Sequence, residues 1–255
     1  MGIAALHPSY SLPMIRAVLI DLDDTLVDHQ HAMRTALRVL RDGDVRLQAL
    51  EYEFLLAEWQ RLLESMHDEV ALGRIPVHES RIIRYRHFYK LAGAPVDRIE
   101  AEAIATSHVQ TYMGNRRAVP GAAALLQMLR RHARIAVVTN NTRAEQDEKL
   151  ATFGLWPHVD ALITSEECGV AKPAAAIFHC ALERLGVAAH EAVMVGDSWA
   201  NDIVGAVNLG MRAVWLNRHG AACPDPLLAA EVTGFEPVAR TAELVLNRAK
   251  RPRAT

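Results

Sequence analysis

The chain has 255 residues, of which 51% are hydrophobic and 23% are charged. This length suits one large domain or a core with a smaller inserted one, and the composition is typical of a globular protein in water. The formal net charge of −2 excludes a strong electrostatic preference for nucleic acid or for an acidic membrane surface. No apolar run approaches the ~20 residues that span a bilayer, and residues 1–13 lack the apolar segment of a signal peptide. The three cysteines are isolated, which argues against a disulfide framework, and we predict a cytoplasmic protein with no nucleic-acid or membrane partner.

The first predicted element is a strand at Ala17–Ile20, a continuous apolar run of the kind that is buried on both faces of a parallel sheet. It leads directly into Asp21-Leu22-Asp23-Asp24-Thr25, so two carboxylates follow the strand at positions i and i+2. Open parallel sheets bind their ligands at this carboxyl edge. Acids buried there need a cation or hydrogen bonds to compensate for their lost hydration. Taken alone, the five residues are equally typical of a solvated acidic turn in which Asp24 or Thr25 caps a short helix.

The next stretch, from about His29 to Arg117, contains only helical patterns, in which apolar residues recur at intervals of three and four. So long a stretch without a strand cannot be a single crossover. We predict a helical domain over residues 29–117, inserted into a core that is formed by residues 1–28 and 118–255. An insertion beside the ligand-binding edge of a sheet is well placed to act as a lid. The polar residues around Asp28 are interpreted as a hinge into this domain rather than as metal ligands.

The remaining chain alternates short apolar strands with helical patterns. Helices are predicted at Gly121–Arg131 and Ala174–Leu185. The further strands are predicted at Ile135–Val138, Ala161–Ile163, Ala192–Val195 and Ala213–Leu216. Alternation of this kind is typical of an α/β fold, so we predict a Rossmann-like parallel sheet of five or more strands with helices on both faces.

Polar side chains follow three of these later segments. Thr139-Asn140-Asn141 comes directly after the second strand, Lys172-Pro173 follows the third, and Gly196-Asp197-Ser198 follows the fourth, with Asp202 a little further on. Each has an ordinary structural explanation on its own: a helix N-cap, a surface lysine before a proline-started helix, and a Gly-Asp turn. Chance placement of all of them after successive strands is improbable, so the conjunction predicts one functional site at the sheet edge.

With these residues in order, the chain resembles the haloacid dehalogenase-like (HAD) hydrolase superfamily, in the branch (subfamily I) whose helical cap lies between the first two motifs. Asp21 to Thr25 matches the first motif, Thr139 the second, Lys172 the third, and Gly196-Asp197 through Asp202 the fourth. The resemblance runs from about residue 15 to 218 and includes the flanking segment from Gln146 to Leu150.

The resemblance implies a Mg²⁺-dependent phosphatase in which Asp21 attacks a phosphate ester and forms an aspartyl-phosphate. It also implies that Mg²⁺ is held by Asp21, the backbone carbonyl of Asp23 and Asp197, a small ligand set of the kind that Mg²⁺ uses. The side chain of Asp23 would then be free to protonate the leaving alcohol and later to activate water.

Four further residues are implied to complete the site. Thr139, Asn140 and Lys172 would bind the transferring phosphoryl oxygens, and Lys172 would also stabilise the charge on Asp21. Asp202 would orient Lys172 or a metal-bound water without binding the metal itself.

The acid at Asp23 favours phosphate-ester chemistry, because dehalogenases and phosphonate hydrolases of this superfamily depart from the pattern there. The predicted partner is a small phosphorylated metabolite: phosphoglycolate, a sugar phosphate, an acylneuraminate phosphate or a nucleotide. A sugar phosphomutase of the same family is an alternative, since it shares the acid/base residue. A catalytically silent binding protein on this fold is a second alternative, although such proteins usually lose one of the acids. We expect a monomer or a weak homodimer.

The helical domain offers one candidate for substrate recognition. On a helix, Arg81, Arg84 and Tyr85 share a face that could contact a polar or anionic group of the substrate. The simpler interpretation is a solvated face on which the arginine stems cover apolar surface.

Overall fold

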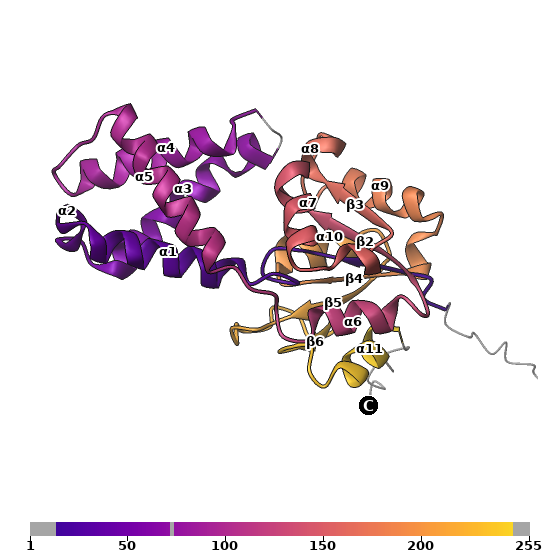
Figure 1. Cartoon of the computed structure of the whole chain (residues 1–255). Helices are drawn as coiled ribbons and strands as arrows, with labels where there is room; N and C mark the ends of the chain where they lie inside the picture. The colour runs from indigo at the N-terminus through magenta and orange to yellow at the C-terminus, as the bar shows by residue number, and fades with distance from the viewer. Residues whose placement is uncertain (1–13, 72–73, 247–255) are drawn as a thin grey trace, which may run out of the picture.

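The computed structural model describes residues 14–71 and 74–246 of the chain. A group of helices, drawn in indigo and magenta, lies beside a sheet with helices packed on both of its faces (Figure 1). The N-terminal segment that we expected not to be a signal peptide lies outside the described residues.

The described residues form a six-stranded parallel sheet in the order β3-β2-β1-β4-β5-β6. This confirms the predicted α/β class and the sheet of five or more strands. The strand that the sequence did not indicate is β6, a three-residue strand at the edge of the sheet. The strands are β1 (Ala17–Ile20), β2 (Arg134–Thr139), β3 (Ala161–Thr164), β4 (Ala192–Gly196), β5 (Arg212–Leu216) and β6 (Ala230–Val232).

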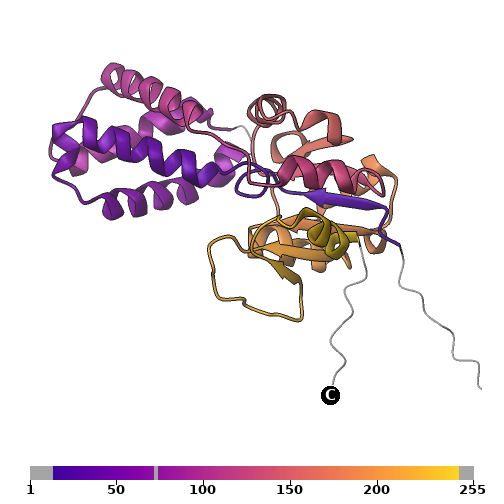
Figure 2. The same cartoon turned by 60° about the horizontal axis from the view of Figure 1, so that its bottom comes forward.

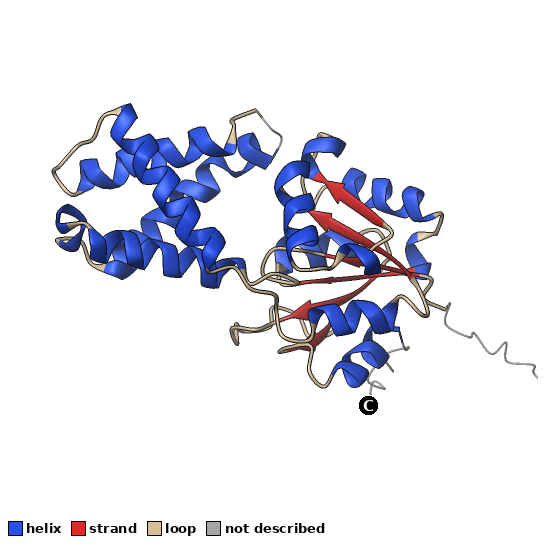
Figure 3. Ribbon diagram, viewed as in Figure 1, coloured by secondary structure: helices blue, strands red, loops and turns tan. Residues whose placement is uncertain are grey.

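Both faces of β1 are buried, as its continuous apolar run predicts. Val18 and Ile20 pack into one core cluster together with residues of α6 (Ala122–Leu129) and α11 (Val238–Leu246). Ala17 and Leu19 pack into a second cluster with residues of α9 (Ala175–Leu185) on the other face. Figure 3 shows the helices on either side of the strands. The two apolar layers fix the position of β1 at the centre of the sheet, so its last residue opens onto the middle of the carboxyl edge.

Short helical segments follow the strands at the carboxyl edge or connect them. α7 comes soon after β2, α8 directly after β3, and η3, a π-helical segment, soon after β4. The bounds of these segments are α7 (Arg143–Thr152), η1 (Trp156–His158), α8 (Ser165–Cys168), η2 (Ala189–Glu191), η3 (Trp199–Val204) and α10 (Gly205–Val207).

The separate helical group has an apolar core of its own, in which Leu37, Leu55, Trp59 and Tyr85 are buried. Its elements are α1 (His29–Gly43), α2 (Val45–Gln48), α3 (Tyr52–Ala71), α4 (Val77–Leu91) and α5 (Arg98–Gly114). We refer to α1–α5 as the cap. The division of the chain at residues 28 and 118 stays a prediction, which this arrangement supports. Across the described part of the chain, the helices are too short or too polar to traverse a bilayer.

Two chain segments connect the cap to the sheet, and they lie side by side (Figure 2). Val27 and Ala118 form an antiparallel bridge between them. The Asp28 carboxylate caps α1 and accepts charged hydrogen bonds from Arg117 at 2.7 Å and from Arg218 of the core at 2.6 Å. The stretch around Asp28 therefore connects the two parts through fixed contacts, and its role as a hinge into the cap stays a prediction.

Candidate active site

The predicted site residues converge at the carboxyl edge of the sheet. Asp21 follows β1, Thr139 ends β2 and Asp197 follows β4. Because β1 lies between β2 and β4, these three residues surround the point where the order of the strands reverses, which is the ligand-binding position of open α/β sheets.

Lys172 joins two of the acids through a single buried ammonium group. Its Nζ donates to Asp21 Oδ1 at 2.7 Å, to Asp202 Oδ1 at 2.6 Å and to the carbonyl oxygen of Val138 at 2.8 Å. Burial alone would lower the pKa of Lys172, but the charges of Asp202 and Asp21 raise it above its ordinary value. The lysine is therefore a fixed positive charge, and all three of its donors are used.

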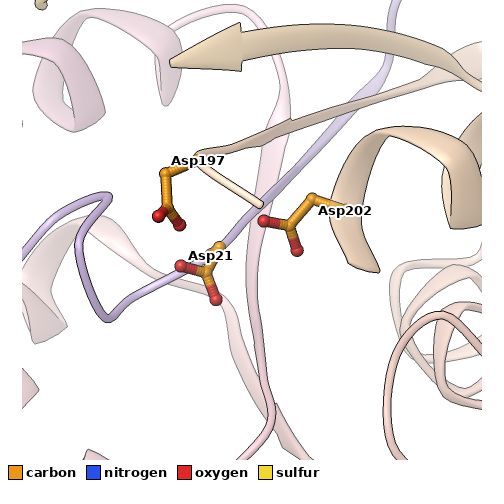
Figure 4. Close-up of side chains that lie close together, drawn as sticks. All are labelled: Asp21, Asp197 and Asp202. Atoms are coloured by element: carbon orange, nitrogen blue, oxygen red, sulfur yellow. The ribbon is translucent and has the colours of Figure 1, made fainter. Parts of the chain in front are cut away.

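Asp21, Asp197 and Asp202 each place a carboxylate oxygen within 4.8 Å of the others, and their side chains point toward one another (Figure 4). Burial, followed by repulsion from the neighbouring acids, raises the pKa of Asp197 to about 8. Burial likewise raises the pKa of Asp21 to about 7, even though Lys172 opposes the shift. Three acids around one ammonium group leave an excess of negative charge, which a hard divalent cation such as Mg²⁺ fits.

Gly196 allows Asp202 to approach this close. A Cβ atom at Gly196 would overlap the Asp202 carboxylate, so no side chain larger than hydrogen fits there without displacing it. The backbone N–H of Ser198 donates to Asp202 Oδ2 at 3.1 Å, which fixes the other oxygen of the same carboxylate. Asp202 therefore holds Lys172 from a buried position at the start of η3.

Thr25 connects the loop after β1 to the loop after β4. Its hydroxyl donates to Asp197 Oδ1 at 3.3 Å and accepts from the backbone N–H of Asp197 at 3.1 Å. Trp215 adds a hydrogen bond from Nε1 to the carbonyl oxygen of Asp197 at 2.7 Å. Within the motif, Asp24 makes a turn with a φ of 64°, a left-handed conformation that aspartate tolerates better than most residues. The five-residue motif is thus a structured loop and not a solvated acidic turn.

The side chain of Asp23 faces a different partner from the other acids. Lys149 Nζ donates to its two oxygens at 2.8 and 2.9 Å, and Gln146 Nε2 donates to Oδ2 at 2.8 Å. Burial alone would raise the pKa of Asp23, but the charge of Lys149 outweighs it and lowers that pKa below its ordinary value. Lys149 is fully buried and also pairs with Glu145 at 3.0 Å.

No role was predicted from the sequence for Lys149 or Gln146. The signal was present, because the two residues are three apart and so share one face of α7. Gln146 also donates to Thr139 Oγ1 at 3.2 Å, so this face of α7 contacts the residues that follow both β1 and β2.

The side chain of Asn140 binds the backbone of Lys172. Its Nδ2 donates to the carbonyl oxygen of Lys172 at 2.9 Å, and its Oδ1 accepts from the Lys172 N–H at 2.7 Å. This pair of hydrogen bonds fixes the backbone that carries the ammonium group. The predicted substrate contact of Asn140 stays a prediction, as do the metal contact of the Asp23 carbonyl and the role of Thr139.

Comparison with known proteins agrees with this geometry. A family model for haloacid dehalogenase-like hydrolases matches residues 15–210, which is most of the chain and includes every predicted site residue. The chain belongs to this family.

Two curated relatives of this HAD hydrolase are phosphatases. Over 205 residues it is 33% identical to ribulose-1,5-bisphosphate 5-phosphatase of Halopiger xanaduensis, and the match covers 79% of the chain and 84% of that protein. It is 43% identical over 108 residues to pyrimidine 5'-nucleotidase YjjG of Escherichia coli, a match that covers 42% of the chain and spans only 48% of that relative. The HAD hydrolase described here is thus a phosphoric monoester hydrolase.

Among solved structures, the fold of this HAD hydrolase is similar to that of the HAD-hydrolase YfnB from Bacillus subtilis bound to magnesium. The TM-score is 0.71 at 24% identity, and the match covers 90% of the chain and 99% of YfnB.

A cavity of about 300 Å³ lies between the cap and the sheet edge of this HAD hydrolase. Asp23, Asn140 and Asn141 line it from the core, and Trp59, Arg84 and Tyr112 are among the residues that line it from the cap. A group leaving from a phosphate near Asp23 would enter this space.

The structure corrects the simpler interpretation of the arginine-rich face of α4. Arg84 is only 4% exposed and Tyr85 is fully buried, so their face is not solvated. The periodicity placed these residues together, but it could not show that α3 and α5 cover them.

Proposed function

We propose that this chain is a Mg²⁺-dependent phosphatase that hydrolyses a small phosphorylated metabolite through an aspartyl-phosphate on Asp21. The carrying observation is the pairing of Asp21 with a buried lysine at 2.7 Å beside the acids Asp197 and Asp202. An ammonium group in this place lowers the repulsion between the attacking carboxylate and the phosphate.

In the first step an oxygen of Asp21 forms a bond to phosphorus while the bond from phosphorus to the leaving alcohol oxygen breaks. Asp23 gives its proton to that oxygen, so a neutral alcohol departs. In the second step a water oxygen attacks the phosphorus, Asp23 takes a proton from the water, and the acyl phosphate bond to Asp21 breaks. Free phosphate and the original Asp21 carboxylate are the products.

The contacts of Asp23 bear on these two steps differently. Lys149 and Gln146 hold it as a carboxylate, which is the form that the second step requires. The first step requires the protonated form, so Asp23 must move away from Lys149 or take up a proton before the alcohol leaves.

The carboxylates of Asp21 and Asp197 and the backbone carbonyl of Asp23 would hold Mg²⁺. Mg²⁺ in such a site neutralises charge on the phosphoryl oxygens. Asp202 is already held by Lys172 and by the N–H of Ser198, so it is suited to keeping the lysine in place rather than to binding the ion.

Named relatives support a small phosphorylated metabolite as the substrate, since one acts on ribulose-1,5-bisphosphate and another is a pyrimidine 5'-nucleotidase. The cavity of about 300 Å³ between the cap and Asp23 is of the size of a small-molecule site.

The test is phosphate release from para-nitrophenyl phosphate and from a panel of metabolite phosphates, with and without Mg²⁺. We expect turnover that needs Mg²⁺ and that is lost in Asp21→Asn but kept in Glu183→Gln, a matched control at an exposed acid of α9. Acid quenching during turnover should trap a phosphorylated protein in the wild type and none in Asp21→Asn.

Full activity of Asp21→Asn would show that Asp21 is not the nucleophile. A phosphomutase would instead require priming by a bisphosphate and would release little free phosphate from any ester.

A further inference from the structure

The cap wall of the cavity is built around one buried arginine. The guanidinium of Arg84 lies over the Trp59 ring, 4.3 Å from its centroid. His108 also stacks on Trp59, with the two ring centroids 5.1 Å apart. Trp59, Arg84 and His108 all line the cavity, so a ligand there contacts an aromatic wall that carries a cation.

Arg84 has no acid partner among the described residues. Its hydrogen bonds run to the carbonyl oxygen and the hydroxyl of Ser80, one turn earlier on the same helix. Glu145, an acid of the core that lines the same cavity, already pairs with Lys149. Burial lowers the pKa of Arg84 to about 10, which still leaves it charged at neutral pH. A buried charge without a counter-ion is costly, and the protein keeps this one at a wall of its ligand cavity.

Two further polar atoms of the same wall have no partner within the described chain. These are Trp59 Nε1, which can only donate, and His108 Nδ1. Burial, followed by the charges of Arg84 and Arg81, lowers the pKa of His108 to about 3, so its imidazole is neutral. Arg81, half-buried on the preceding turn of α4, adds a second cation to the lining. The wall therefore places positive charge beside aromatic side chains.

We propose that Arg84 binds a second anionic group of the substrate, a carboxylate or a phosphate on the leaving group, remote from the ester that is hydrolysed. This inference rests on the proposed function, because it assigns the leaving group to the cap cavity. A planar guanidinium matches either oxyanion with two parallel hydrogen bonds. We therefore expect the enzyme to prefer substrates that carry a second anionic group on the leaving group over substrates whose leaving group is uncharged.

Matched pairs of esters test this charge preference. One pair is para-carboxyphenyl phosphate and para-carbamoylphenyl phosphate, which have the same shape and differ in one charge. The other is pentanediol bisphosphate and pentanediol monophosphate. We expect the wild type to show a higher kcat/KM for the anionic member of at least one pair, and the pair that shows it identifies the group as carboxylate or phosphate.

Arg84→Met should reduce that preference by roughly tenfold to a hundredfold, the usual effect of losing a charged hydrogen bond. Arg84→Lys keeps the charge without the planar fork, so it should retain part of the preference. Arg86→Met, at an exposed arginine of the same helix that does not line the cavity, is the control and should leave the ratio unchanged.

Thermal melts separate this role from a structural one. Because Arg84 pairs with no acid among the described residues, its replacement by methionine leaves none of those carboxylates unpaired, and Arg84→Met should melt within a few degrees of the wild type. If it does not fold, the comparison rests on Arg84→Lys. Equal kcat/KM for both members of both pairs in the wild type, or a preference that survives in the Arg84 variants, would overturn the proposal.

Calorimetry keeps the test independent of turnover. Binding of the same esters to Asp21→Asn, with and without Arg84→Met, measures the contribution of Arg84 to affinity directly. If the wild type releases no phosphate but the charged esters bind more tightly through Arg84, the proposed function fails and the anion site stands. If all esters are hydrolysed without regard to charge, the proposed function stands and the anion site fails.

Discussion

Replacing Gly196 by alanine should disconnect Lys172 from Asp202 through one added methyl group. The new Cβ atom would overlap the Asp202 carboxylate, which is fully buried. Displacing that carboxylate breaks its 2.6 Å contact with Lys172 and its 3.1 Å contact with the N–H of Ser198. The substitution is therefore a test of whether the buried lysine depends on this one acid.

The expected cost follows from the contact that is lost. Breaking a buried ion pair costs about 3–5 kcal/mol, and Lys172 keeps its bond to Asp21, so we expect about 3 kcal/mol. In a protein of this size each kcal/mol corresponds to roughly 2–4 °C, which gives a fall in Tm of about 6–12 °C. The proposed phosphatase turnover should fall by about a hundredfold, because the ammonium group no longer lies where charge develops.

Thermal melts followed by circular dichroism, together with phosphate release, measure both effects. Gly114→Ala is the matched control, because a Cβ atom there meets nothing within 4 Å and the residue ends a helix. In an Asp202→Gly background the overlap is gone, and the same Gly196→Ala change should cost less than about 1 kcal/mol. A Gly196→Ala protein as stable as Gly114→Ala would refute the reasoning.

Three further predictions concern the metal, the cap and the joint between the two parts. Mg²⁺ at about 100 times its Kd should raise the free energy of unfolding by about 2.7 kcal/mol, and Asp197→Asn should remove most of that rise in melts with and without the ion. The folded-state pKa of His108 is about 3, below its ordinary value of 6.5, so only the unfolded chain takes up its proton as the pH falls. Between pH 7.5 and 5.5 the titration of His108 should contribute a loss of about 1.4 kcal/mol in the free energy of unfolding, so the wild type should lose about that much more stability than His108→Gln in urea unfolding over this interval; equal pH slopes for the two proteins would contradict the assignment. Asp28→Asn should cost about 2 kcal/mol, chiefly through the half-buried Arg218, while Asp28→Glu should recover part of it in the same unfolding assay.

The parts of the fold that the sequence predicted are those with a strong local pattern. β1 could be predicted residue by residue because four apolar side chains in a row require burial on both faces. The short strand β6 could not, because its three residues include an exposed glutamate and it pairs with β5 alone at the edge of the sheet. Its conformation is set by the neighbouring strand, and no pattern in its own residues indicates it.

The site residues at the strand ends could be placed for a related reason. Asp21, Asp197 and Thr139 lie at or just after the ends of parallel strands, and parallel strands bring their carboxyl ends to one edge. The connection from sequence to site therefore passes through topology alone and requires no knowledge of side-chain packing.

The burial of two cations on helices, Lys149 and Arg84, could not be predicted in this way. Periodicity shows which residues share a helix face, but it does not show which other element covers that face. Lys149 is covered by Asp23 and Glu145, two acids that together balance its charge, which makes it a structural ion pair with a consequence for catalysis. Arg84 is nearly as buried, yet among the described residues only the uncharged oxygens of Ser80 accept its hydrogen bonds. The number of acids beside a buried cation separates a structural ion pair such as that of Lys149 from the proposed ligand-binding role of Arg84. That number can be read from the folded structure but not from the sequence.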